Sequence, residues 1–257
     1  MSKMFDSMRR AEDERRKRAQ GSAPEEASKP PVQRDTHEAG RVVNSTEFSD
    51  ELLRQLGILR NSIEVELAGK TKRVIMFTSS MPGEGTTTIA ANFAKILALQ
   101  GSERVLVCEM NARRPAFSEV FSTNGESGIT EYFVSGNGLA ELVQRNEVDD
   151  LGVLHVGHQD ATIIQLHLNK VFPRLLAEAL KNFDTVIVDA PPVLSSPETP
   201  PMAEFVDGVV LVVHSGKTKR EAVARAIESI NNFKGKMLGV VLNRKRYYIP
   251  GFIYRRI

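Results

Sequence analysis

A short segment with two glycines and three consecutive threonines could hold a phosphate group. The apolar run at residues 74–78 precedes it, and a helical pattern opens at Ile89. A glycine-rich turn between a strand and a helix directs several backbone N–H groups at one anion, and the start of the helix adds its positive dipole end. The Thr87 hydroxyl would then face a metal ion. The predicted nucleotide-binding residues are Pro82, Gly83, Glu84, Gly85, Thr86, Thr87 and Thr88.

The loop lacks the positive charge that phosphate-binding loops carry. Thr86 stands where the standard loop has lysine after its last glycine, and Met81 stands where variant loops have a second lysine. Loss of a lysine contact to developing phosphate charge should slow phosphoryl transfer by roughly 10²-fold or more. Binding through backbone amides need not be lost. The alternative is an ordinary glycine-rich turn without a ligand.

The surrounding pattern predicts an α/β fold, with a parallel sheet and helices on both faces. Ser49 should cap a helix that runs to about Leu67. Apolar strand-like runs then alternate with helical patterns, which is typical of parallel sheets. The expected strands are 74–78, 105–108, 185–188, 209–213 and 238–242, and the expected helices are 89–99, 171–180 and 221–230. Residues 128–170 indicate only a helix, a strand and a loop.

Length and composition favour one globular domain with extensions. The chain has 257 residues, of which 41% are hydrophobic and 26% charged, and no apolar run is long enough to span a bilayer. The net charge of +2 gives no case for nucleic-acid binding, and the single Cys108 fits a buried thiol in a reducing compartment. We expect a soluble, cytoplasmic chain. Its predicted parts are a charged arm and disordered linker (1–45), a nucleotide-binding domain (46–243) and a basic tail with tyrosines (244–257).

Four ordered motifs resemble one known family. The stretch VIMFTSSMPGEGTTTIAANFA is similar to the nucleotide loop of the bacterial tyrosine kinases, or BY-kinases, which share a P-loop superfamily with the deviant-Walker ATPases MinD and ParA. The stretch VLVCEMNARRP resembles their second acidic motif and FDTVIVDAPPVL their Walker B strand. The stretches DGVVLVVHSGKTKREAV and GVVLNR resemble their last strands and helix. The resemblance covers residues 48–244 and implies a P-loop NTPase fold that binds ATP or ADP with Mg²⁺.

The resemblance also assigns catalytic and metal-binding residues. Asp189 ends the Walker B strand, whereas Glu109 and Asn111 replace the two aspartates of the second acidic motif. It predicts Thr87, Glu109 and Asp189 around the metal. An amide such as that of Asn111 cannot take a proton from a tyrosine hydroxyl as a carboxylate can. Alternatively, Asp189 only caps the turn that follows its strand.

The resemblance gives roles to three further groups. Asn243 matches the family position near the adenine base, although it could be a plain turn residue. Tyr247, Tyr248 and Tyr254 match a terminal cluster that a neighbouring subunit phosphorylates. The tail could instead pack on the body or touch an anionic membrane. A ring-forming motif of one glutamate and two arginines is incomplete, because one of its positions falls on glycine among Glu51, Arg54, Gly57 and Arg60.

Three functions remain open at this point. The first is a pseudokinase or weak kinase that regulates exopolysaccharide or capsule synthesis and export. It would dock on a Wzz-like membrane polysaccharide co-polymerase, peripheral to the inner membrane. The second is an active tyrosine autokinase in which Arg113 or a partner replaces the loop charge. The third is a MinD/ParA-like spatial regulator. Further expected partners are a second copy of the chain or an active kinase relative, and no nucleic acid.

Overall fold

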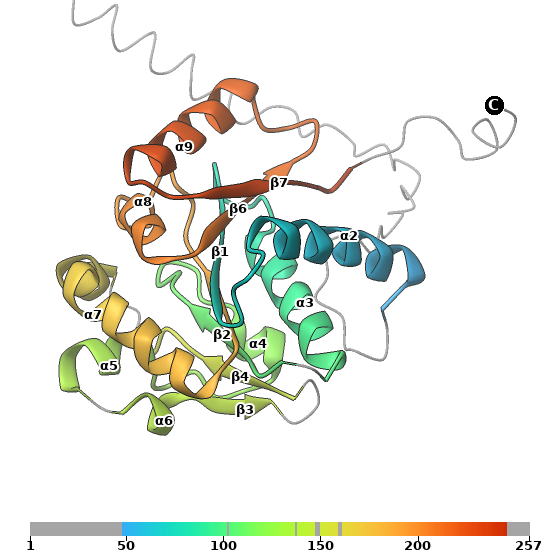
Figure 1. Cartoon of the computed structure of the whole chain (residues 1–257). Coiled ribbons are helices and arrows are strands. Elements are labelled where there is room, and N and C mark those ends of the chain that lie inside the picture. Colours follow the sequence, from blue (N-terminus) through green and yellow to red (C-terminus); the bar gives the residue numbers. More distant parts are fainter. Residues whose placement is uncertain (1–47, 102, 137, 147–149, 159–160, 246–257) are drawn as a thin grey trace, which may run out of the picture. The chain divides into compact units, whose positions relative to one another are not determined.

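A seven-stranded sheet forms the centre of the part of the chain that the structure describes (Figure 1). The computed structural model describes residues 48–245 apart from 102, 137, 147–149 and 159–160. The strand order is β3-β4-β2-β5-β1-β6-β7, and all neighbours are parallel except β3 with β4. The strands are β1 (Arg73–Ser79), β2 (Val105–Glu109), β3 (Gln144–Asn146), β4 (Leu151–Leu154), β5 (Thr185–Asp189), β6 (Gly208–His214) and β7 (Met237–Asn243).

Helices cover both faces of this sheet, as the sequence predicted. Successive side chains of a strand point to opposite faces, so β1 contributes Val74 and Met76 to one buried cluster and Ile75 and Phe77 to the other. The cluster of Ile75 and Phe77 is completed by α2 (Asp50–Glu66), α3 (Thr86–Leu99) and α4 (Phe117–Phe121). The cluster of Val74 and Met76 is completed by α5 (Ile129–Ser135), α6 (Leu139–Leu142), α7 (Ala161–Asn182), α8 (Thr199–Met202), the 3-10 helix Ala203–Phe205 and α9 (Arg220–Asn232).

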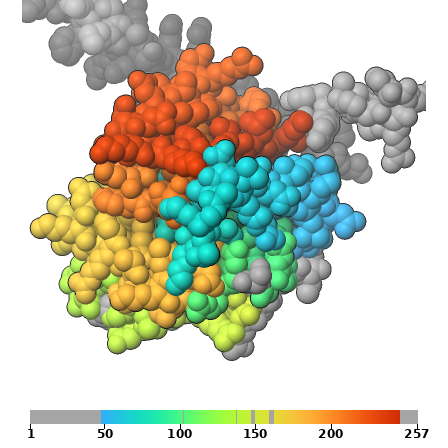
Figure 2. Space-filling view, viewed as in Figure 1, coloured from blue at the N-terminus to red at the C-terminus, as the bar shows by residue number. Residues whose placement is uncertain are grey.

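The predicted start of α2 is confirmed, since the Leu52 amide donates to the Ser49 hydroxyl at 3.3 Å. Figure 2 shows α2, in blue, beside the orange-red β7, which is an edge strand of the sheet. Val240 and Leu242 of β7 are exposed although they are apolar. Cys108 is buried, as expected, and burial raises the pKa of its thiol.

Two stretches differ from the sequence-based prediction. The segment 128–170 holds α5, α6, β3 and β4 as well as the first half of α7. The helix predicted at 171–180 therefore begins ten residues earlier, at Ala161, because Ile164, Leu168 and Phe172 continue its buried stripe across Pro173. The helix predicted at Ile89 begins at Thr86, so the three threonines form its first turn.

The predicted arm lies outside the described residues, and of the predicted tail only Arg244 and Lys245 are described. The three tail tyrosines are therefore not described. None of the helices within the described ranges is both long and apolar enough to cross a bilayer.

Candidate functional site

The carboxyl ends of β1, β2 and β5 bring the predicted site residues to one edge of the sheet (Figure 1). The Cα atom of Asp189 pairs with that of Phe77 on one side and with that of Glu109 on the other. The glycine-rich loop follows β1 directly and leads into α3. Ligands of open α/β sheets bind at this edge. The loop, Glu109 and Asp189 are thus brought together.

The loop adopts a shape that requires its glycines. Gly83 and Gly85 have φ angles of 81° and 91°, in the left-handed region that side chains disfavour. A Cβ atom on Gly85 would also lie 2.2 Å from the Asn243 side-chain nitrogen. Gly85 caps α3, whose first turn carries no acidic residue. The first N–H groups of this helix have no intrahelical partners, so they can bind an anion.

The Glu84 side chain points inward, although sequence analysis grouped this residue with the nucleotide-binding ones. Its carboxylate accepts hydrogen bonds from the backbone N–H groups of Ser80 at 2.8 Å and Met81 at 3.0 Å. It also accepts from the Thr218 hydroxyl and, at 3.4 Å, from the His214 N–H. The residue is only 2% exposed. The Glu84 side chain therefore fixes the loop and joins it to the segment after β6, a role that the sequence did not indicate.

Asp189 and Thr87 form the part of the site that fits a magnesium ion. The Thr87 hydroxyl donates to Asp189 Oδ2 at 2.6 Å, and Oδ1 is buried without a hydrogen-bond partner among the described residues. Burial raises the pKa of Asp189 to about 7; the nearby Glu109 charge adds to this, and the bond from Thr87 opposes it. A buried carboxylate with an open oxygen beside a hydroxyl supplies the hard oxygen ligands that Mg²⁺ prefers.

Glu109 holds a neighbouring helix in place. Its Oε1 atom accepts from the N–H groups of Ala116 at 2.5 Å and Phe117 at 2.8 Å, at the start of α4. Its Oε2 atom lies 3.4 Å from the Val156 nitrogen and 3.8 Å from His155 Nδ1. Both carboxylate oxygens thus have partners within the chain. A contact of Glu109 with a metal-bound water stays a prediction.

His155, to which the sequence assigned no role, belongs to this buried group. Its Nε2 atom lies 2.8 Å from the Thr123 hydroxyl, and Nδ1 has no hydrogen bond to any residue that the structure describes. The spacing of the histidines could not reveal this contact, because it joins the end of β4 to the loop after α4.

The other predicted side chains, Asn243, Asn111 and Arg113, differ in their hydrogen-bond partners. The Asn243 amide donates to the Glu84 carbonyl at 2.9 Å, so it supports the loop; its contact with adenine stays a prediction. The Asn111 side-chain oxygen is buried and without a hydrogen bond among the described residues. Arg113 donates to Ser196 at 2.8 Å and to the buried Glu198 at 2.5 Å. The charge of Arg113 is therefore already paired.

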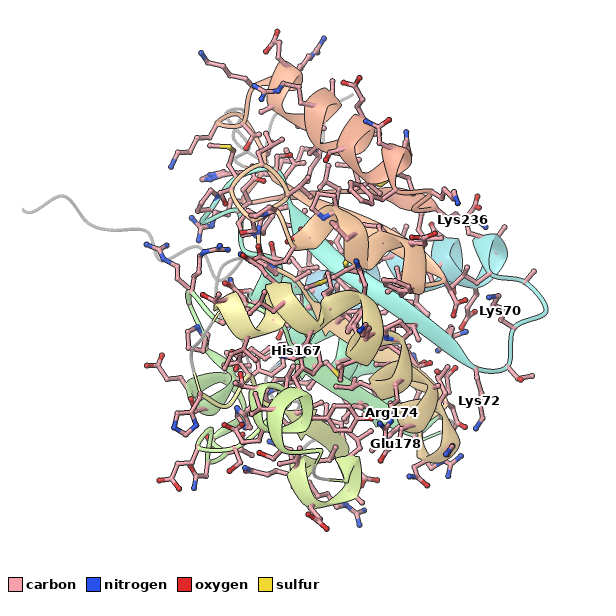
Figure 3. The ribbon with its side chains drawn as sticks, turned by 90° about the vertical axis from the view of Figure 1, so that its left-hand side faces the viewer. Lys70, Lys72, His167, Arg174, Glu178 and Lys236 are labelled. Carbon is pink, nitrogen blue, oxygen red and sulfur yellow. The ribbon has the colours of Figure 1, made fainter. Side chains whose placement is uncertain are left out.

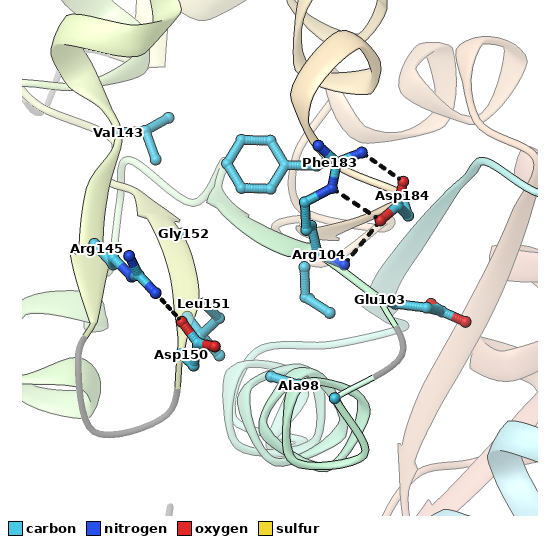
Figure 4. A pocket seen from close by; sticks show the side chains of 12 residues that line it. Ala98, Glu103, Arg104, Val143, Arg145, Asp150, Leu151, Gly152, Phe183 and Asp184 are labelled. Carbon is cyan, nitrogen blue, oxygen red and sulfur yellow. Dashed lines mark hydrogen bonds and ion pairs between the residues drawn. The ribbon is translucent and has the colours of Figure 1, made fainter.

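A cavity of about 550 Å³ lies at the other edge of the sheet (Figure 4). It is lined by residues at the starts of β2, β4 and β5, including Arg104 and Asp184. The Arg104 guanidinium binds Asp184 and lowers the pKa of that carboxyl to about 2. Arg145 and Asp150 form a second ion pair there. This cavity is separate from the candidate nucleotide site.

Comparisons with known proteins identify consistent relatives. The family model described as an AAA domain matches residues 72–242. Tyrosine-protein kinase YwqD of Bacillus subtilis is 32% identical over 205 residues, which cover 80% of this chain and 86% of the relative. The succinoglycan biosynthesis transport protein ExoP of Rhizobium meliloti is 29% identical over 181 residues, 69% of this chain but only 23% of that protein.

Solved structures agree with the fold. The chimerical protein CapA2B2 is 29% identical and superposes with a TM-score of 0.70, over 77% of this chain and 87% of that one. The kinase domain of the Escherichia coli tyrosine kinase ETK has a TM-score of 0.71 at 22% identity, over 77% and 79% of the two chains. Cyanothece apo McdA has a TM-score of 0.57 at 16% identity, over 66% and 72%. The likenesses to ETK and McdA show the fold alone.

Proposed function

Because this chain belongs to the bacterial tyrosine kinase (BY-kinase) family, we propose that it is a nucleotide-binding regulator of polysaccharide export whose own kinase activity is weak or absent. The observation that carries the proposal is Thr86, a neutral residue at the first position of α3. The site retains a phosphate loop and a metal-binding carboxylate. It lacks the lysine that would follow the transferred phosphate.

Nucleotide binding is supported by the groups that remain. The left-handed Gly83 and Gly85 and the open N–H groups at the start of α3 suit a chain of phosphates. Thr87 and Asp189 would hold Mg²⁺, and a bound Mg²⁺ ion would neutralise phosphate charge. ATP or ADP is therefore the proposed ligand.

Phosphoryl transfer is disfavoured by the groups that are missing. Transfer depends on positive charge placed where negative charge develops, and Thr86 offers only a hydroxyl there. Asn111 cannot act as a base, and both oxygens of Glu109 accept hydrogen bonds from backbone N–H groups. Arg113, the candidate replacement cation, is paired with Glu198.

A membrane co-polymerase is the proposed partner. The relative ExoP is named as a transport protein of succinoglycan biosynthesis, and this chain covers only a fraction of it. CapA2B2 is described as a chimera, so a relative of this domain has been joined to another chain. We place the protein at the cytoplasmic side of the membrane through a Wzz-like partner of this kind.

An active tyrosine kinase is the second candidate, and Asp189 favours it. Its carboxylate would hold the Mg²⁺ ion that transfer from ATP requires. The tail would supply Tyr247, Tyr248 and Tyr254 as acceptors. A MinD/ParA-like spatial regulator is the third candidate. Against it, this chain has Met81 where such regulators have their signature lysine.

Incubation of the purified full chain with Mg²⁺ and ATP labelled at the γ phosphate separates these functions. We expect bound ATP with little transfer to protein and little release of phosphate. Rapid tyrosine phosphorylation of the tail would overturn the proposal in favour of the active kinase. Phosphate release without transfer would instead favour the spatial regulator.

A further inference from the structure

The charges around the phosphate loop make anion binding unfavourable without an added cation. Glu84, Glu109 and Asp189 place three carboxyl groups at or beside the loop, and all three are buried. No lysine in the loop offsets them, because Thr86 and Met81 are neutral. A bound Mg²⁺ ion would offset part of this charge. A nucleoside triphosphate adds more negative charge, so further positive groups near the site would strengthen its binding.

A basic segment, residues 217–220, lies next to the loop. It contains Lys217, Lys219 and Arg220, and all three side chains are exposed. The Thr218 hydroxyl between the two lysines donates to the Glu84 carboxylate of the loop. The Cα atoms of Lys217 and Lys219 are each about 3.8 Å from that of Thr218, one peptide unit away. The stem of each lysine therefore starts one residue from the contact between Thr218 and Glu84.

Backbone contacts fix the basic segment in this position. The Lys217 and Thr218 N–H groups donate to the His214 carbonyl at 3.2 and 3.1 Å, which closes a turn after β6. The Ser215 N–H donates to the Asn243 carbonyl at 2.9 Å, and the Asn243 amide donates to the Glu84 carbonyl. The turn is thus joined to the loop directly and through the end of β7.

Two acidic residues neighbour this segment: Glu84, whose carboxylate accepts from Thr218, and Glu221, in the first turn of α9. Among the described residues, 48–245 without 102, 137, 147–149 and 159–160, none of the ion pairs involves Lys217, Lys219 or Arg220. Arg113, by contrast, is held by the buried Glu198. The basic segment therefore supplies cations that no ion pair among the described residues holds.

The same cations stand at an unfavourable place in their own helix. Lys219 is the N-cap of α9 without a side-chain cap bond and Arg220 is its first residue, while Glu221 is the acidic residue of its first turn. The positive dipole end of a helix favours acids and disfavours cations there. A bound anion would remove this conflict, since it would be attracted by the helix start and by both side chains.

We propose that residues 217–220 bind the phosphate groups of the nucleotide and replace, for binding, the positive charge that the loop lacks. This inference rests on the proposed nucleotide-binding function. The basic segment neutralises phosphate charge from the β6 side of the loop. It approaches from outside the loop, so it supports affinity without restoring the contact that transfer requires.

The test measures nucleotide affinity of the full chain by calorimetry with Mg²⁺ and ATP. The variant Lys217→Ala/Lys219→Ala/Arg220→Ala should bind ATP at least about tenfold more weakly, the loss expected for hydrogen bonds to charged groups. Its affinity should also depend less on salt. Introducing Thr86→Lys into this variant should restore most of the affinity. Its melting temperature should stay level or rise, because the change removes cations from the start of α9.

A matched control removes three positive charges elsewhere, with Lys72→Ala, Lys170→Ala and Lys236→Ala. Figure 3 shows Lys72 and Lys236 on the side of the sheet where β1 begins. The phosphate loop follows the opposite end of β1. This control should bind ATP as the natural protein does. If the triple variant does not fold, the single variants Lys217→Gln and Lys219→Gln are measured in its place.

Two failures can be told apart. If the natural protein binds no nucleotide, both the proposed function and this inference are wrong. If it binds ATP and the triple variant binds it equally well, or the control loses as much affinity, only the inference is wrong. Equal binding would leave the basic segment as a surface for an acidic protein partner.

Discussion

At the scale of single residues, burial gives Asp189 a property that an exposed aspartate lacks. Its pKa is raised from the ordinary 3.8 to about 7, chiefly because burial disfavours the charged form. The folded state therefore binds this proton more tightly than the unfolded state. The stability it contributes is fully present below about pH 3.8 and is lost as the pH rises through about 7.

This difference predicts the pH dependence of stability without metal. The free energy of unfolding should fall between pH 5 and pH 7 in the natural protein, and Asp189→Asn should flatten the curve over that range. Denaturant titrations at several pH values measure it. Asp184→Asn is the control: its pKa is lowered to about 2, so its contribution is lost only in acid and the slope should persist. An unchanged slope in Asp189→Asn would contradict the account.

Glu84 is the residue whose charge shapes the loop. Glu84→Gln leaves one acceptor oxygen in place of two. If the amide oxygen stays on the Ser80 and Met81 N–H groups, the amide nitrogen faces the His214 N–H, which then loses its acceptor. We expect unfolding to become easier by about 1–3 kcal/mol and nucleotide affinity to fall. Thermal unfolding and calorimetry measure the two effects. Glu119 is an exposed residue of α4, so the control Glu119→Gln should change neither quantity. If Glu84→Gln binds nucleotide with full affinity, Glu84 does not fix the loop in its binding shape.

At the scale of elements, α4 depends on a carboxylate from β2. Five residues are too few for a helix to be stable alone, and Glu109 accepts from two N–H groups at its start. Glu109→Ala should destabilise the protein by about 1–3 kcal/mol and speed hydrogen exchange across α4. Exchange in β5 should change less. Glu119→Ala serves as the control, and unaltered exchange in α4 would count against this role.

The elements that the sequence predicts well are those with strong local patterns. Residues 74–78 and 185–188 are apolar on both strand faces because helices cover both, and the structure places them in the middle of the sheet. The short β3 has no such pattern: Gln144 and Arg145 are polar, and only pairing with β4 makes them a strand. The predicted helix 171–180 starts close to Pro173, since proline is tolerated in the first turn of a helix, whereas the structure places Pro173 in the interior of α7.

The candidate site was predictable in its positions but not in its side-chain directions. The predicted strand ends and the glycines of the loop indicated that the loop, Glu109 and Asp189 lie at the carboxyl edge of the sheet. The inward turn of Glu84 depends on Thr218, which is 134 residues away along the chain. The pairing of Glu109 with the start of α4 likewise arises only after folding. Contacts of this kind leave no spacing signal.

At the scale of the whole molecule, the proposed role requires other proteins. A chain that binds ATP but transfers its γ phosphate poorly should still be a substrate for an active kinase of the same family. Mixed with such a kinase and ATP, it should gain tyrosine phosphate on the tail, and alone it should not. Mass spectrometry identifies the sites, and replacement of Tyr247, Tyr248 and Tyr254 by phenylalanine should abolish the signal. Phosphorylation of the described domain instead of the tail would contradict this expectation.

The central claim is that the loop binds nucleotide while the absent lysine limits transfer. Its most direct measurement compares the natural protein with Thr86→Lys, each saturated with Mg²⁺ and ATP labelled at the γ phosphate. The measured quantity is the rate at which label reaches tyrosine. We predict that both proteins bind ATP, that the natural protein transfers little, and that Thr86→Lys transfers faster. Rapid transfer by the natural protein, unchanged by the lysine, would contradict the account.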